Sequence, residues 1–159
     1  MSAASHSRGQ AIPGPALVLT VLGAACVVAG GLVAAATGPL DLAHGSWMAA
    51  YLVLVGGVAQ HVMGRVRSSY DPSRWARWGW MQVLGWNGGN ALVIGGTQVD
   101  VPLLVDLGSV LLVGALVVAL YADRGARGPL PLRWGYRLLL LVMALSIPIG
   151  IVLSHLRHG

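Results

Sequence analysis

The sequence predicts an all-α protein, a bundle of five transmembrane helices with the N-terminus in the cytoplasm and the C-terminus outside. Three observations predict this class. Of 159 residues, 56% are hydrophobic and only 9% are charged, with a mean hydropathy of +0.74, whereas soluble domains carry about 25% charged residues. Apolar stretches of membrane-spanning length recur along the chain. The arginines gather in the segments that separate them.

Five apolar stretches meet or approach the roughly 20 residues that cross a hydrocarbon core about 30 Å thick. They are residues 16–36, 44–64, 78–96, 101–122 and 137–154. Gln82, Asn87 and Asn90 make the third stretch the most polar. We predict one transmembrane domain over residues 16–155.

Short polar tails flank this predicted domain. Residues 1–15 are rich in Ser, Gly, His and Pro and predict a disordered cytoplasmic tail. Residues 156–159 form a short tail at the other end.

The orientation follows from the arginines, because short loops rich in Lys or Arg stay on the cytoplasmic side. With the N-terminus inside, nine of the ten basic residues fall on inner segments, and these nine are Arg8, Arg65, Arg67, Arg74, Arg77, Arg124, Arg127, Arg133 and Arg137. Only Arg157 falls outside. Omitting the third span would break this pattern. We therefore expect a multi-pass protein of the cell membrane.

The composition also excludes several function classes. A nucleic-acid binder needs a basic patch on a polar face, and here the arginines separate apolar runs. The single Cys26 excludes a disulfide framework. The sequence contains no GxSxG, HExxH, P-loop or strand-borne dinucleotide motif, and it leaves open whether the protein is an enzyme.

Glycine spacing predicts tight helix packing. Small residues four apart let membrane helices approach closely, and Gly85 and Gly89 have this spacing. Such faces favour a compact bundle, and a homo-oligomer or a complex with a partner membrane subunit.

Three ionisable residues are predicted near the outer face, each on a different span. They are His44, Asp106 and His155. Neutral imidazole is the commonest metal ligand, and a carboxylate often orients such a histidine, so His44 and His155 are candidate metal ligands and Asp106 their orienter. Gly45 would leave room beside the ring for a flat macrocycle. The alternatives are histidines that lie in the headgroup layer and an aspartate that pairs locally.

Two further candidates lie on the second span. Tyr51 follows His44 by two turns on nearly the same face, where plain packing is the commoner role. His61 lies about 25 Å from His44 at 1.5 Å per residue, at the inner end. Arg65 and Arg67 beside it, with Arg74 and Arg77 across the loop, predict a positive rim that would hold haem propionates or anionic lipid headgroups.

The segment Ala43-His44-Gly45-Ser46-Trp47-Met48, followed by Gly56-Gly57, resembles the second helix of subunit I in haem-copper oxidases. The resemblance covers about twenty residues and implies that His44 is an axial ligand of a low-spin haem. The sequence has no histidine cluster like the copper ligands of those enzymes, so the resemblance does not imply an oxygen-reducing centre. It implies only a low-spin haem site, with His155 as its second ligand. Without a CxxCH motif the haem would be b-type.

Three functions stay open on the sequence. The first is an integral membrane protein that binds haem b near the outer face for electron transfer or for gas or redox sensing. The second is a non-enzymatic accessory or scaffold subunit of a membrane complex. The third is a small transporter, although five spans do not divide into the repeats typical of that class.

Overall fold

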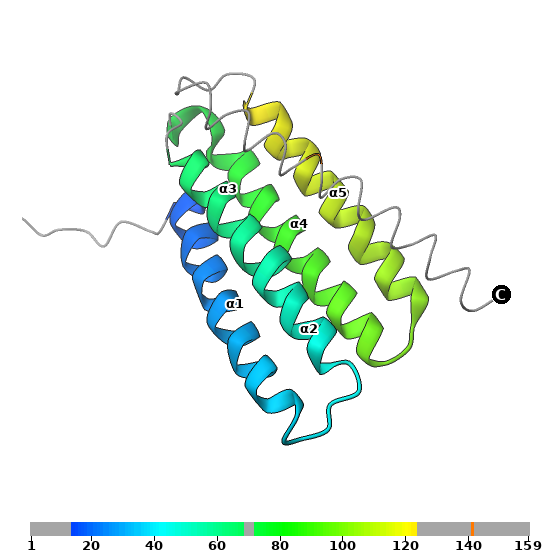
Figure 1. Ribbon diagram of the computed structural model, residues 1–159. Coiled ribbons are helices and arrows are strands. Elements are labelled where there is room, and N and C mark those ends of the chain that lie inside the picture. Colours follow the sequence, from blue (N-terminus) through cyan, green and yellow to red (C-terminus); the bar gives the residue numbers. More distant parts are fainter. Residues whose placement is uncertain (1–13, 69–71, 124–140, 142–159) are drawn as a thin grey trace, which may run out of the picture.

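The computed structural model describes residues 14–68, 72–123 and 141. Within these residues every regular element is helical (Figure 1). The elements are α1 (Pro15–Thr37), α2 (Gly45–Tyr51), η1 (Leu52–Ala59), α3 (Gln60–Arg67), α4 (Pro72–Gln98) and α5 (Pro102–Asp123). Except for Leu141, the predicted fifth span lies outside the described residues, as do residues 1–13 of the predicted tail.

Proline and aspartate set the ends of the helices. Pro15, Pro72 and Pro102 each begin a helix, where the missing N–H costs no hydrogen bond. Asp41 and Asp100 have φ of 47° and 52° in the two tight connections. Aspartate tolerates this left-handed conformation better than most residues, so each connection reverses the chain within a few residues.

Among the described residues, three helices are long and apolar enough to cross a membrane. They are Pro15–Thr37, the continuous helix Gly45–Arg67 formed by α2, η1 and α3, and Pro102–Tyr121 of α5. The third predicted span is a helix too, the 27 residues of α4, but it does not belong to these apolar three. The all-helical class is thus confirmed for the described residues, and three helices are long and apolar enough for a membrane protein. The five-span count and the orientation stay predictions.

The helices form two antiparallel hairpins whose members approach backbone to backbone. The first hairpin pairs α1 with Gly45–Arg67, and the second pairs α4 with α5 (Figure 1). A Cβ on Gly23 would lie 2.6 Å from the backbone nitrogen of His61, and one on Gly89 would lie 2.8 Å from the carbonyl oxygen of Gly108. Only glycine allows this separation. Of the predicted pair, Gly89 lies at such a contact, whereas a Cβ on Gly85 would make an ordinary contact 3.6 Å from Cβ of Ala115.

Large side chains fill the space between the two hairpins. Leu19 of α1, Met63 of α3, Trp86 of α4, and Leu112 and Leu116 of α5 are fully buried there and belong to one hydrophobic cluster. The core therefore draws on every long helix that the structure describes.

The π-helical turns of η1 were not predicted by the apolar pattern. Their hydrogen bonds run from residue i to i+5, which widens the helix and changes the direction of the side chains that follow. Gly57 lies within η1, where a Cβ would be 2.6 Å from Cγ2 of Val27. The π-helical segment η1 is therefore also a segment that packs closely against α1.

Candidate functional site

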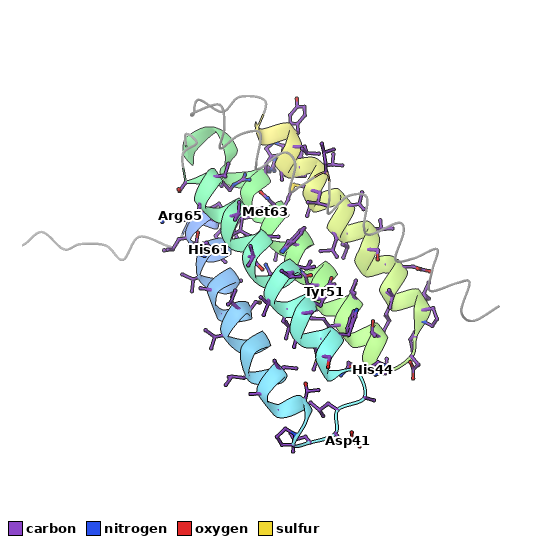
Figure 2. All side chains as sticks on the ribbon, in the orientation of Figure 1. Asp41, His44, Tyr51, His61, Met63 and Arg65 are labelled. Atoms are coloured by element: carbon purple, nitrogen blue, oxygen red, sulfur yellow. The ribbon has the colours of Figure 1, made fainter. Side chains whose placement is uncertain are left out.

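His44 lies at the end of the bundle predicted to face outward. It precedes the first residue of α2 with φ −108° and no side-chain capping bond, and its side chain is exposed. Figure 2 places it near Asp41, while His61 and Arg65 lie at the opposite end. The imidazole is accessible for binding.

Gly45 has a packing role that differs from the predicted one. The residue is buried, and a Cβ there would lie 2.8 Å from Cγ2 of Thr37 and 2.9 Å from Cβ of Leu42. The space beside Gly45 is therefore filled by the end of α1. Its lack of a side chain brings the start of α2 against Thr37 and so fixes the position of His44.

A groove of about 500 Å³ runs between α1 and α2 at this end of the bundle. Its lining is mostly small: Gly30, Gly31, Ala34, Ser46, Ala49 and Ala50 are among its residues. Ser46 follows His44 by two positions. The groove therefore presents bare backbone and methyl groups, and its lining begins two residues after His44, which is not itself a lining residue.

The predicted cluster of His44, Asp106 and His155 is only partly described. Asp106 lies in the second turn of α5 and is half-buried, and α5 packs mainly against α4. His155 lies outside the described residues. Among the residues whose placement is described, no three His, Cys, Asp or Glu side chains are grouped to hold a metal ion.

His61 is held by the first helix. Its Nδ1 lies 3.1 Å from the carbonyl oxygen of Thr20, which fixes the plane of the ring. Arg65, one turn further, is exposed as expected for the positive rim. Arg67 does not belong to that rim: its side chain is 7% exposed and its Nη1 donates to Oε1 of Gln82.

Tyr51 lies at the junction of α2 and η1. Its ring stacks on Trp47 with 5.2 Å between centroids and 29° between planes, and it packs against the hydrophobic core. Its hydroxyl oxygen is buried without a hydrogen-bond partner among the described residues. Packing accounts for the burial of the Tyr51 ring, but it does not account for the burial of a hydroxyl group without a hydrogen-bond partner.

A line of polar side chains joins the two hairpins, and we call it the polar seam. It consists of Gln60, Met63 and Arg67 from α3 and Gln82 and Asn87 from α4. Nε2 of Gln60 donates to Oδ1 of Asn87 at 3.1 Å, and Nε2 of Gln82 donates to Sδ of Met63 at 3.3 Å. Hydrogen bonds of this kind hold membrane helices together where lipid provides no hydrophobic drive.

The polar seam is the arrangement that sequence reasoning missed. Gln60 is fully buried and Gln82 is 1% exposed. The sequence shows only that both are polar residues within predicted spans, and this was the one feature that could have indicated the seam. Pairing them needs the register between α3 and α4, and the sequence does not contain it.

The chain matches no protein-family model, no curated protein and no solved structure.

Proposed function

We propose that this chain is an integral membrane protein that binds a b-type haem near the predicted outer face, for electron transfer or for gas or redox sensing. The observation that carries the proposal is the position of His44, an exposed imidazole two residues before Ser46 of the small-residue groove. The likeness of this segment to the second helix of haem-copper oxidase subunit I supports the same ligand.

The residues of the groove fit a flat apolar group. Its volume of about 500 Å³ lies within the roughly 300–1,000 Å³ of small-molecule sites. Gly31 and Ala34 leave part of one wall nearly free of side chains, whereas the bare face of Gly30 is filled by Val53 and the carbonyl oxygen of Ala49. A planar ring can therefore lie against the backbone of α1.

Each candidate residue has a distinct part in this proposal. His44 would hold the haem iron, and Gly45 positions the start of α2. Asp106 of α5 and Tyr51 of α2 are the other polar candidates, but neither lines the groove. His155 is the proposed second ligand. A bound haem supplies a one-electron redox centre whose potential depends on ligation and burial. His61, at the opposite end, is proposed to hold anionic headgroups together with Arg65.

A second function is favoured by the same groove. Small residues also line the contacts between membrane helices, so a helix of a partner subunit or of a second copy fits there. In that case the chain is an accessory or scaffold subunit and binds no pigment.

Absorbance spectroscopy separates the two proposals. The protein is expressed with haem available, purified in detergent, and measured oxidised and after dithionite reduction. We expect a Soret band that shifts on reduction and is largely lost in His44→Ala. His61→Ala is the matched control and keeps the band, provided that both variants elute like the wild type on gel filtration. A colourless wild type that elutes as a defined oligomer supports the accessory subunit instead.

A further inference from the structure

Polar atoms without partners lie in the core beside the polar seam. In the part of the chain that the structure describes, these atoms are Oη of Tyr51, Oε1 of Gln60, Nε1 of Trp86 and Oδ1 of Asn90. Gln60 and Trp86 are 0% exposed and Asn90 is 7% exposed. A buried polar atom left without a partner keeps the full cost of its desolvation. Such atoms therefore point to a bound molecule.

Three of these atoms belong to residues on one turn of α4 and on the part of α3 that bonds to it. The side-chain amide of Gln60 reaches α4, since its nitrogen donates to Asn87. Trp86 precedes Asn87 directly, and Asn90 lies one turn further, where its Nδ2 donates to the carbonyl oxygen of Trp86 at 2.9 Å. Side chains three or four apart on a helix have Cβ atoms about 5–6 Å apart. One turn of α4 and its contact residue on α3 thus carry all three atoms.

The chemistry of the three atoms selects the molecule that fits. Gln60 and Asn90 each offer an acceptor oxygen, and the Trp86 indole offers a donor N–H. All three groups are uncharged, so a buried ion would lack compensation for its desolvation. Water can donate twice and accept from a third group. Buried waters in proteins make about three such bonds.

We propose that a buried water molecule bridges the two hairpins at this point, donating to Oε1 of Gln60 and Oδ1 of Asn90 and accepting from Nε1 of Trp86. This water completes the hydrogen bonding of the seam at mid-helix. It is independent of haem and goes beyond the proposed function.

The π-helix brings a fourth polar group to the same interface. Nine residues of α-helix make two and a half turns, so Tyr51 and Gln60 would lie on opposite sides of an ordinary helix. The wider turns of η1 between them take more residues each, and both polar atoms are buried. The Tyr51 hydroxyl is thus a fourth buried polar atom without a partner on the same continuous helix, nine residues before Gln60.

NMR of the protein labelled with ¹⁵N-tryptophan tests this site. The full chain contains six tryptophans, and the Trp86→Phe variant identifies the Trp86 indole signal by its loss. In perdeuterated detergent we expect a nuclear Overhauser cross-peak between this indole proton and water. Its sign should be that of two protons close in space, not that of chemical exchange with the solvent. An indole proton with cross-peaks to aliphatic protons alone would overturn the proposal.

Two variants sharpen the test. Gln60→Met with Asn90→Leu removes both acceptors, so the water cross-peak of Trp86 should disappear. Ser109→Ala is the control, because Ser109 is also buried but donates to the carbonyl oxygen of Val105 in its own helix. It should leave the cross-peak unchanged. If the double variant does not fold, the wild-type cross-peak still decides the outcome.

Discussion

At the residue scale, Gly23 determines how close α1 lies to the second helix. A Cβ at this position would be 2.6 Å from the backbone nitrogen of His61 and 2.8 Å from the carbonyl oxygen of Gly57. Both neighbours are backbone atoms, so no side chain can move aside to make room. The helices themselves would have to separate.

Gly23→Ala should therefore destabilise the bundle. We expect the free energy of unfolding to fall by about 1–3 kcal/mol, the usual cost of overpacking, measured by SDS-induced unfolding in mixed micelles. Gly31→Ala, in the same helix, is the matched control because a Cβ there meets nothing within 4 Å. Equal stability of the two variants would contradict the close packing of α1.

Arg67 is a buried cation whose hydrogen bond to Gln82 crosses between the hairpins. Gln82→Leu removes this acceptor, and we expect a loss of about 1.5–3 kcal/mol, since bonds to charged groups are the stronger ones. Gln98→Leu, at the exposed end of the same helix, should change stability little. The same unfolding assay measures both, and a Gln82→Leu variant as stable as Gln98→Leu would exclude a role for this bond.

At the element scale, α4 differs from its neighbours. It is 27 residues long but carries Gln82, Asn87 and Asn90. Gln82 and Asn87 bond to Arg67 and Gln60 of α3 only in the folded bundle, whereas the side-chain nitrogen of Asn90 donates within α4. An isolated α4 in lipid would lose the two bonds to α3. We therefore expect α4 to depend on α3 for insertion into a membrane.

We expect an isolated α4 segment to insert poorly and an isolated α5 segment to insert almost fully. Polar side chains at the centre of a helix disfavour insertion, whereas Leu and Val favour it. Glycosylation mapping in microsomes measures both fractions. Replacing Gln82, Asn87 and Asn90 with leucine should restore insertion of α4. Complete insertion of the unmodified segment would refute the dependence on its neighbours.

The sequence predicted the elements better than the contacts between them. Helices cover the first four predicted stretches. Apolar length decides three of them, whereas the polar third stretch was predicted from the arginine pattern, and Pro72 begins α4 six residues before the predicted start at Trp78. The π-helix was not predicted, because residue spacing does not encode its widened backbone. The bond between Gln60 and Asn87 joins residues 27 positions apart and depends on helix register. Of the predicted ligands, His44 is accessible at the expected end, and His155 lies outside the described residues.

At the scale of the whole molecule, the two ends of the second helix define the orientation. The connection that contains Asp41 precedes Gly45, and Ser68 follows Arg67. These ends lie about 35 Å apart at 1.5 Å per residue, a distance sufficient to cross the hydrocarbon core. The arginine pattern predicts that Asp41 faces outward and Ser68 inward.

Cysteine labelling tests this orientation. In a Cys26→Ala background, Asp41→Cys should react with a membrane-impermeant maleimide in intact cells, and Ser68→Cys should react only after permeabilisation. The reverse pattern would invert the topology and place His44 at the cytoplasmic face.

The central claim is that haem binds beside His44, and the haem content of the purified protein tests it most directly. A pyridine haemochrome assay on protein from haem-supplemented cells identifies the haem type and gives the amount per chain. We predict one b-type haem per folded chain, because ligation and burial must retain it without a covalent bond. Folded protein that carries no haem, and takes none up when haem is titrated into it, would contradict the claim.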